Sequence, residues 1–398
     1  MKVYRVAMLG HKDHGKSTLI GSLLIKTKSV TKQRIEEAKK ASKELGKAFE
    51  PAFLLDSFYE EQRNGMTLDT TRAEIHYKNV AIELIDVPGH EELIKNMITG
   101  ASYASAAVLI ISAKKNEGIK PQTKRHLYLA SMLGIDKLLV AVNKMDTVNY
   151  SDEVFNNIKN GIEPFIKELN LKEYYFVPIS AYNGENLTTN SIHMKWYKGK
   201  PLLDVLLRLL KTNKSKDKRF IGIVQSKIED KFAIHILNGE LKSNDLVKVL
   251  PQGKIAKVKS IYNGLKPSNK AKVGDNVMIS TDVVLNRGDL LVHKNDKLEP
   301  VSMFLGKIFL ANNIDKRNVV IRINGLDYNA KISFIKRIDP TRNKELDGKP
   351  GQLEVAIVKV NVEKSVAVEP FEINKDIGKF TIFDNKNNFL GFGNVLKL

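Results

Sequence analysis

An apolar run, a glycine-framed loop and a helical pattern follow one another near the start of the chain. Residues 3–9 read VYRVAML, residues 10–18 read GHKDHGKST, and residues 17–27 show the spacing of a helix. The loop fits the pattern G-x-x-x-x-G-K-S, in which glycines let backbone amides point inward at phosphate oxygens and the following helix N-terminus favours anions. This order of strand, loop and helix predicts an α/β nucleotide-binding domain.

Strand-like and helical segments alternate over the first 210 residues. Apolar or alternating runs predict strands at 3–9, 72–77, 80–86, 106–112, 137–143 and 174–180. Helical patterns occur between them, at 17–27, 32–48, 91–101, 121–133 and 151–169. Such alternation predicts a mostly parallel sheet with helices on both faces, which is the fold class of an α/β P-loop domain.

The pattern changes in the second half of the chain. The stretch KTNKSKDK has no large apolar side chain and is predicted to be a linker. Beyond it, short alternating strands recur with Gly, Asn and Asp turns, as in LNGELKSNDLVKVLPQG, which favours antiparallel β-barrels. A break at LEPVS divides this part in two. We therefore expect a nucleotide-binding domain at 1–210, a linker at 211–218, and β-barrel domains at 219–297 and 298–398.

Charge and composition narrow the range of functions. The chain has no cysteine, which excludes disulfides and thiolate chemistry and suits a cytosolic, cytoplasmic protein. No apolar run has the length of a membrane span and no signal peptide fits before the glycine loop, so no membrane partner is expected. Residues 1–210 carry 30 Lys and Arg against 24 Asp and Glu, and residues 211–398 carry 34 against 21. The basic second half fits either a solvated lysine-rich surface or an acidic partner, a protein or RNA.

The glycine loop supplies the predicted contacts to the phosphates of a nucleotide. Gly10 and Gly15 permit the turn, Lys16 brings positive charge to the β and γ phosphates, and Ser17 offers a hydroxyl to Mg²⁺. Lys12 adds a further positive charge to the loop, which we interpret as a surface lysine. The predicted phosphate-binding residues are Gly10, His11, Asp13, His14, Gly15, Lys16, Ser17, Thr18 and Gly89.

A second motif indicates the base. The letters NKMD follow the predicted strand KLLVAV, and Asp146 in that position can accept hydrogen bonds from both N1 and N2 of guanine. Adenine has no matching pair of donors and would leave the carboxylate buried and unpaired, which gives large discrimination. The stem of Lys144 can lie along the base plane while Asn143 holds the loop, and Ser180 and Ala181 would complete the pocket. GTP and GDP are therefore the predicted nucleotides.

Two further segments are predicted to respond to the γ-phosphate. DVPGH places Asp86 at a strand end, where it can reach Mg²⁺ through a water, and Gly89 where its amide can approach the γ-phosphate. RNGMTLD supplies Thr67, a hydroxyl able to complete the Mg²⁺ shell when triphosphate is bound. Loss of the γ-phosphate would release both segments. The predicted metal ligands are thus Ser17, Thr67 and Asp86.

In this order the motifs resemble the G domain of the translation-factor GTPases, especially archaeal and eukaryotic elongation factor 1-alpha. The matching stretches are GHKDHGKST, EEQRNGMTLD, DVPGHEELIKNMITGAS, NKMDTVNYS and ISAYNGEN…WYKGKPLLDVL. The resemblance implies GTP binding, GTP hydrolysis and two β-barrels after the G domain. It also implies that His90 positions the attacking water, so the predicted catalytic residues are His90, Lys16 and Thr67. Because no residue is recognisable as an arginine finger, intrinsic hydrolysis is expected to be slow.

Stretches of the second half resemble the GTPase subunit of heterodimeric sulfate adenylyltransferase. VLPQGKIAKVKSI at 249–261 and NRGDLLVH at 286–293 carry this resemblance. In that system GTP hydrolysis is coupled to the formation of adenylyl sulfate by a separate subunit. The main hypothesis is therefore a regulatory GTPase subunit whose partner is the adenylyl-transferring subunit.

A translation or ribosome-rescue GTPase that binds aminoacyl-tRNA and the ribosome is the alternative. His14 in the glycine loop and the basic second half favour it. The stretch between Arg219 and Gly239 counts against it, because it lacks the glycine-rich strand pair where elongation factors dock aminoacyl-tRNA end groups. A related protein with another protein client is the third hypothesis. Trp196, the one tryptophan, is interpreted as a packing anchor rather than a base-stacking residue.

Overall fold

The computed structural model of the protein describes residues 3–44, 49–54, 71–86, 104–171, 173–211, 219–314 and 318–398. The chain divides into two compact units, the first essentially Met1–Thr212 and the second essentially Asn213–Leu398. No helix in the covered ranges is both long enough and apolar enough to cross a membrane.

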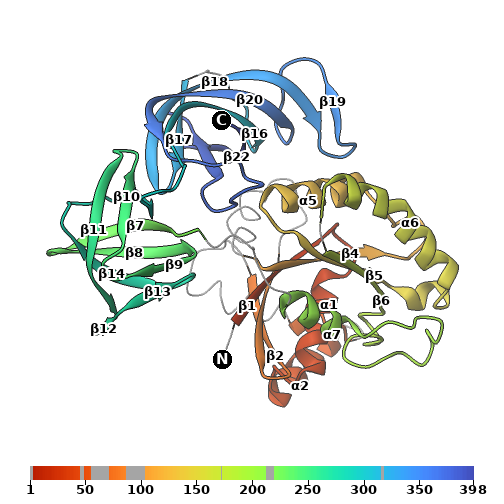
Figure 1. Ribbon diagram of the computed structural model, residues 1–398. Helices are drawn as coiled ribbons and strands as arrows, with labels where there is room; N and C mark the ends of the chain where they lie inside the picture. Colours follow the sequence, from red (N-terminus) through yellow and green to blue (C-terminus); the bar gives the residue numbers. More distant parts are fainter. Residues whose placement is uncertain are drawn as a thin grey trace. The chain divides into compact units, whose positions relative to one another are not determined.

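The first unit is built around a six-stranded sheet in the order β2-β3-β1-β4-β5-β6 (Figure 1). β2 is antiparallel to β3, and the other neighbouring strands are parallel. Every residue of β4 is buried, as expected for a central strand of a sheet covered on both faces. The strands are β1 (Val3–Gly10), β2 (Thr71–Tyr77), β3 (Val80–Asp86), β4 (Ala106–Ser112), β5 (Lys137–Asn143) and β6 (Glu173–Pro178).

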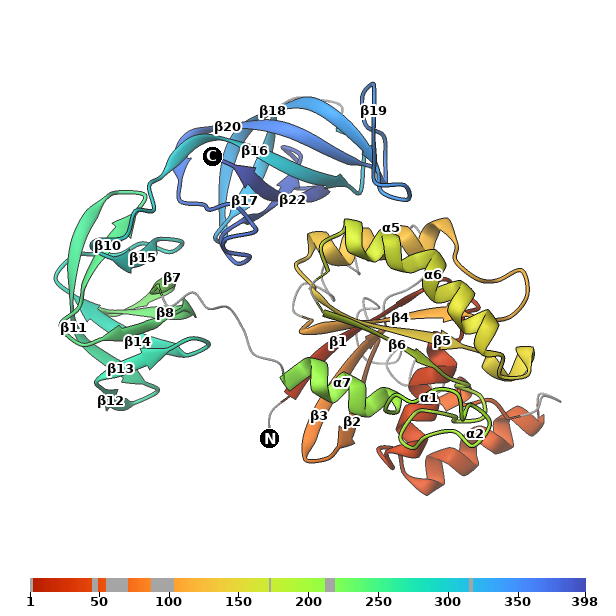
Figure 2. The same cartoon turned by 45° about the vertical axis from the view of Figure 1, so that its right-hand side comes forward.

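Helices cover both faces of this sheet, with α1 and α7 on one side and α5 and α6 on the other (Figure 2). On the first side, Leu23 of α1 and Leu206 of α7 share a core with Val108 of β4. α6 begins where the Ser151 hydroxyl accepts a hydrogen bond from the amide of Val154, a typical N-cap. The described helices are α1 (Lys16–Lys26), α2 (Lys32–Glu44), α5 (Pro121–Met132), α6 (Asp152–Glu168), α7 (Leu202–Lys211) and the short 3₁₀ helix η2 (Met145–Val148).

The predicted α/β P-loop fold class is confirmed, with two differences in detail. Helix α7 is not among the elements predicted from the sequence, and Lys211, predicted to open the linker, is its last residue. The helix predicted at 91–101 and the rest of the linker, 212–218, lie outside the described residues.

The second unit begins with a closed six-stranded barrel in the order β10-β15-β7-β8-β14-β11, which pairing between β10 and β11 completes (Figure 1). β12 extends the sheet from β11, and β9 pairs separately with β13. The turns use the residue types that tolerate positive φ, such as Gly239 and Asn244. The strands are β7 (Ile221–Ile228), β8 (Lys231–Asn238), β9 (Glu240–Lys242), β10 (Leu246–Leu250), β11 (Lys254–Asn263), β12 (Lys266–Ser268), β13 (Lys270–Lys272), β14 (Asn276–Thr281) and β15 (Leu290–His293).

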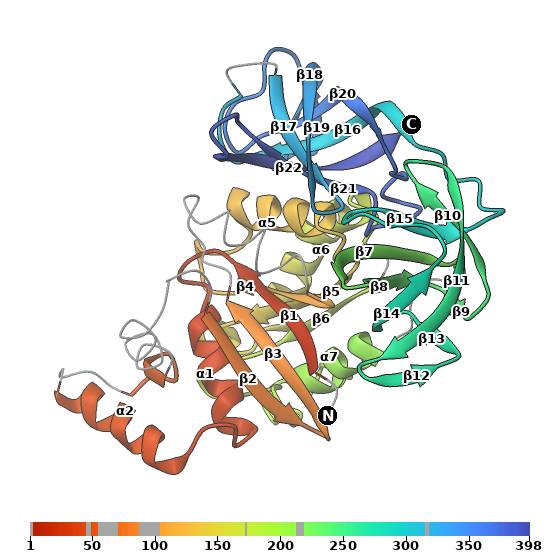
Figure 3. The same cartoon turned by 90° about the vertical axis from the view of Figure 1, so that its left-hand side faces the viewer.

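A second closed barrel follows in the order β17-β21-β22-β16-β20-β18, completed by pairing between β17 and β18 (Figure 3). β19 extends it from β18. A Cβ at Gly391 of β22 would lie 2.1 Å from the carbonyl oxygen of Phe309 in β16, so glycine is required where these strands approach. The strands are β16 (Val301–Leu310), β17 (Asn318–Ile323), β18 (Leu326–Asp339), β19 (Lys344–Leu346), β20 (Val355–Val366), β21 (Lys379–Phe383) and β22 (Phe389–Lys397).

The two barrels share an apolar contact and an ion pair. Leu290 of the first barrel belongs to one buried cluster with Ala367 and Ile377 of the second. The guanidinium of Arg219 donates to both carboxylate oxygens of Glu369, at 2.7 and 3.0 Å. The two antiparallel barrels predicted from the strand rhythm are therefore present, and they pack as one unit.

Candidate functional site

The predicted motifs meet at one edge of the six-stranded sheet. The glycine loop follows β1, Asp86 ends β3, Asn143 ends β5, and Ser180 comes just after β6. Because carboxyl ends of parallel strands lie at the same edge, these residues gather there. The chain switches from β3 to β4 across β1, and ligands in open α/β sheets bind at such a switch point.

Two glycines shape the loop between β1 and α1. Gly10 has φ +148°, and a Cβ there would lie 2.7 Å from the carbonyl oxygen of Ile110. Gly15 has φ +88° in the left-handed region, and its Cβ would lie 2.5 Å from Nδ2 of Asn143. Gly15 is also the N-cap of α1, and no side chain caps this helix start. The first amides of α1 are therefore free of a capping side chain, as anion binding requires.

Lys16 is a buried cation at the start of α1. Only 8% of the residue is exposed, and its Nζ donates to the carbonyl oxygen of Gly10 at 3.2 Å. Burial lowers the pKa of Lys16, while the nearby charges of Asp86 and Asp13 act to raise it. A buried ammonium needs a compensating anion, and the phosphates of a nucleotide supply one.

The two histidines of the loop act as anchors. His14 is 1% exposed, and burial lowers its pKa to about 4, so it is neutral at pH 7. Its Nδ1 lies 3.2 Å from the carbonyl oxygen of Ile110, which requires the proton on Nδ1. His11 hydrogen-bonds through Nδ1 to the Gln122 side chain at the start of α5. Lys12 is exposed, in agreement with its interpretation as a surface lysine.

Asn143 connects three loops of the site. Its Nδ2 donates to the carbonyl oxygen of His14, and its Oδ1 accepts from the amide of Ala181, both at 2.9 Å. Ser22 of α1 donates in turn to the carbonyl oxygen of Ala181 at 2.5 Å. The glycine loop, the NKMD loop and the loop after β6 are thereby held as one assembly.

The residues predicted to surround guanine lie together in this assembly. The hydroxyl of Ser180 donates to Oδ1 of Asp146 at 2.5 Å, which fixes the orientation of the half-buried carboxylate. Lys144 has φ +63°, and its Nζ donates to Oε2 of Glu117 at 2.8 Å. The predicted guanine-binding residues thus include a carboxylate held by Ser180 and a lysine side chain held by Glu117.

Glu117 is a residue of the site that the sequence analysis missed. It lies in the loop after β4, at the same edge of the sheet as the predicted motifs. Burial acts to raise the pKa of Glu117, but hydrogen bonds from Lys144 and Ser112, with the charges of Lys144 and Lys114, outweigh it and lower the pKa to about 2. The sequence signal that could have identified Glu117 is an acidic residue in the loop that follows the buried strand β4.

The Glu117→Gln substitution tests this ion pair through its pH dependence. Because the folded-state pKa lies below the ordinary 4.5, the pair stabilises the fold fully above about pH 4.5 and loses its effect as pH falls towards 2. We expect the free energy of unfolding to fall by about 1–2 kcal/mol at pH 7, with the difference from the parent shrinking below pH 4.5. Urea unfolding across this range measures it, with exposed Glu153→Gln as control. A difference in unfolding free energy that does not change with pH would contradict a stabilising ion pair between Glu117 and Lys144.

Three predicted residues, Thr67, Gly89 and His90, lie outside the described residues. Of the predicted Mg²⁺ ligands, Ser17 at the start of α1 and buried Asp86 at the end of β3 are both on the described edge. Their hydroxyl and carboxylate oxygens are the donor types that Mg²⁺ takes when nucleotide phosphates complete its shell.

A phosphate loop with a buried lysine, joined to an Asn-Lys-x-Asp wall at the carboxyl edge of a parallel sheet, defines a P-loop GTPase. The comparisons agree: the family model described as the elongation factor Tu GTP binding domain matches residues 1–212, and the model described as GTP-eEF1A C-terminal domain-like matches residues 310–396. The chain belongs to the translation-factor family of GTPases related to elongation factor 1-alpha.

Individual relatives match nearly the whole chain. Elongation factor 1-alpha of Thermoplasma acidophilum is 34% identical over 400 residues, covering 94% of this chain and 93% of that protein. The Archaeoglobus fulgidus elongation factor 1-alpha is 33% identical over 417 residues, covering 99% and 97%. Among solved structures, the GTP-bound GTPase-like domain of S. cerevisiae Ski7 has a TM-score of 0.51 at 18% identity, covering 99% and 97%, which shows a shared fold.

Proposed function

We propose that this chain is a GTP-driven switch that acts in translation, binding an RNA client in one nucleotide state and releasing it in the other. The match to archaeal elongation factor 1-alpha carries the proposal, because it spans 94% of this chain and 93% of the relative. A match of that extent includes both barrels as well as the nucleotide-binding domain.

The nucleotide chemistry of the proposal follows from the described loops. Asp146, held by Ser180, accepts from guanine, while Lys16 and the amides at the start of α1 hold the phosphates. Ser17 and Asp86 would hold Mg²⁺, which neutralises charge on the transferring phosphoryl group when bound. The ligand role of Thr67 and the water-positioning role of His90 stay predictions from the sequence.

The positive charge on the outer face of the first barrel supports the proposal that the client is acidic. Along β11, Ala256 and Val258 point into the barrel, so the alternating residues Lys257 and Lys259 point outward. Neighbouring short strands add more exposed lysines. The exposed lysines of this region are Lys242, Lys254, Lys257, Lys259, Lys266, Lys270 and Lys272. Such a concentration of positive charge fits phosphate-backbone binding, whose strength falls steeply with salt.

The sulfate-activating hypothesis gains no support from the comparisons. The relatives reported above, which cover nearly the whole chain, are elongation factors 1-alpha. The antiparallel pair β7–β8 lies between Arg219 and Gly239, joined by a short turn at Glu229 and Asp230. Gly222 is the one glycine of residues 221–238, so the pair is not glycine-rich. A client bound on this barrel is therefore expected to use its lysine-rich face rather than a glycine-rich strand pair.

Binding of tRNA in the two nucleotide states tests the proposal. Aminoacyl-tRNA and deacylated tRNA are titrated against the full chain with GDP or a non-hydrolysable GTP analogue, at 50 and 200 mM salt. We expect binding that depends on the nucleotide and weakens at least tenfold between these salt concentrations. Absence of RNA binding in both states, with co-purification of an adenylyl-transferring subunit, would overturn the proposal in favour of sulfate activation.

A further inference from the structure

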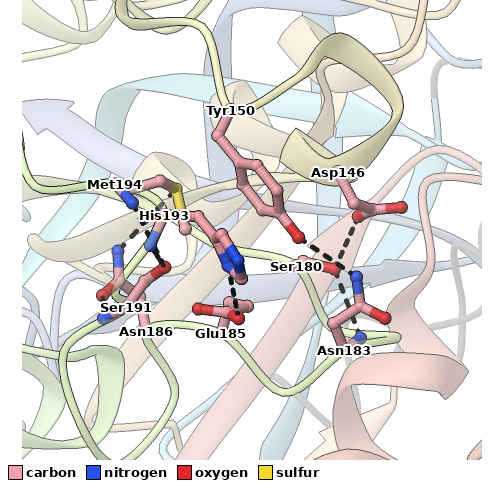
Figure 4. A network of polar contacts seen from close by, with 9 residues as sticks. All are labelled: Asp146, Tyr150, Ser180, Asn183, Glu185, Asn186, Ser191, His193 and Met194. Atoms are coloured by element: carbon pink, nitrogen blue, oxygen red, sulfur yellow. Dashed lines mark hydrogen bonds and ion pairs between the residues drawn. The ribbon is translucent and has the colours of Figure 1, made fainter.

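A network of side chains extends from Asp146 to residues that were not among the predicted guanine-binding residues (Figure 4). We propose that Tyr150 is a positioning residue for guanine recognition, which sets the orientation of the Asp146 carboxylate through Asn183 and Ser180. The inference rests on the guanine-binding role given above to Asp146, and it assigns to that site a specificity-determining residue that lies four positions beyond the NKMD motif.

The connection from Tyr150 to the carboxylate has three steps. Nδ2 of Asn183 donates to the Tyr150 hydroxyl at 3.2 Å. The backbone amide of Asn183 donates to the Ser180 hydroxyl oxygen, also at 3.2 Å. The Ser180 hydroxyl in turn donates its own hydrogen bond to Oδ1 of Asp146, at 2.5 Å. Because the hydroxyl of Ser180 has one proton, the amide of Asn183 directs it towards the carboxylate.

Tyr150 itself is held on three sides. Its backbone amide donates to the carbonyl oxygen of Met145 at 2.8 Å, and its carbonyl accepts from Nε1 of Trp196 at 2.8 Å. Its ring stacks on His193, with ring centroids 4.8 Å apart and 13° between the planes. Tyr150 has φ +54°, a left-handed conformation that costs energy for a large residue and persists only where the surrounding contacts hold it. A tyrosine held in this way keeps its hydroxyl in a fixed position, and the Asn183 side chain that bonds to it is fixed as well.

The loop after β6, which contains Asn183, is also held at its far end. Ser180 and Glu185 exchange backbone hydrogen bonds of 3.3 and 2.9 Å, closing the loop that contains Asn183. Nδ1 of His193 donates to Oε1 of Glu185 at 3.0 Å. The stacked pair of Tyr150 and His193 therefore contacts both arms of the loop (Figure 4).

The network is connected to the base-binding part of the site and not to the phosphate-binding part. The network touches the carboxylate that receives the base, and none of its hydrogen bonds reaches the glycine loop or Lys16. Loss of the Tyr150 hydroxyl should therefore impair recognition of the guanine ring while leaving phosphate contacts unchanged. Hypoxanthine, which lacks the exocyclic 2-amine, makes one hydrogen bond fewer to the carboxylate and depends less on its orientation.

The Tyr150→Phe variant, compared for GDP, GTP and inosine diphosphate, tests the inference. We expect GDP binding to weaken about three- to tenfold, the range for loss of one hydrogen bond. Inosine diphosphate should lose less than about twofold, so the preference for guanine falls. The ratio of GTP to GDP affinity should stay at the parent value. Isothermal titration of the full chain measures all three.

Tyr197→Phe is the matched control. Tyr197 packs in the same aromatic cluster as Trp196, but its hydroxyl donates to the carbonyl of Lys200 at 3.1 Å and not to the guanine loops. It should keep the parent preference for guanine. Asn183→Ala removes the same link from its other end and should reproduce the effect of Tyr150→Phe, and combining the two should add nothing further.

Equal losses for GDP and inosine diphosphate, or the same loss in Tyr197→Phe, would overturn the inference and leave Tyr150 a structural residue. Asp146→Asn separates this failure from that of the site. If Asp146→Asn abolishes GDP binding and Tyr150→Phe changes no ratio, only the role of Tyr150 is refuted. If Asp146→Asn keeps full affinity, the guanine assignment itself is refuted.

Discussion

The Asp146→Asn variant should lose about a thousandfold in affinity for GTP and GDP and gain affinity for xanthosine nucleotides. The carboxylate accepts from N1–H and the 2-amine of guanine, whereas an asparagine amide presents a donor to the 2-amine. The base and the amide would then both leave buried polar groups unpaired, which is the costly case. Xanthine has a carbonyl in place of the 2-amine, so the new amide donor finds an acceptor.

Titration with guanosine, xanthosine and adenosine diphosphates measures this exchange. Exposed Asp152→Asn, at the start of α6, is the control and should keep guanine specificity. Circular dichroism shows whether the variant is folded, and binding of a xanthosine nucleotide shows that its phosphate site is intact. Unchanged GDP affinity in Asp146→Asn, or ATP binding as tight as GTP binding in the parent, would refute the base assignment.

The sequence predicted the strands of the first unit closely because its parallel strands are short apolar runs between helices. β3, β4 and β5 lie at the predicted residues, and β1 is longer by one residue. Helix α7 was missed because seven of its ten residues are buried and apolar. Its polar residues Asp204, Arg208 and Lys211 recur at spacings of four and three, which is the helical signal that could have found it.

Contacts between loops were harder to predict than the loops themselves. The phosphate and NKMD motifs are local, so their residues can be read from order and spacing. The bonds of Asn143 to His14 and of Lys144 to Glu117 join residues 129 and 27 positions apart, and they depend on which strands are neighbours. Barrel closure depends on the same kind of pairing, since β10–β11 and β17–β18 are set by tertiary packing. Residue patterns alone do not specify such pairs.

The Lys16→Met variant should lose about a hundredfold or more in affinity for GTP and GDP, because phosphate oxygens would face a buried site without its cation. Guanosine, which has no phosphate, should bind as tightly as it does to the parent. The nucleotide-free fold should change by less than about 1 kcal/mol, since the cost of burying the ammonium opposes its attraction to Asp86 and Asp13.

Linkage turns this affinity loss into a measurable stability change. At a GDP concentration of about 1,000 times the parent Kd, binding stabilises the parent by about 4 kcal/mol, and a hundredfold weaker variant keeps only about 1.4 kcal/mol. Thermal unfolding with and without GDP therefore separates a lost phosphate contact from a damaged fold. Lys12→Ala, an exposed lysine in the same loop, should keep nearly the full parent stabilisation. If Lys16→Met also keeps nearly the full stabilisation by GDP, the positive charge of Lys16 does not hold the phosphates.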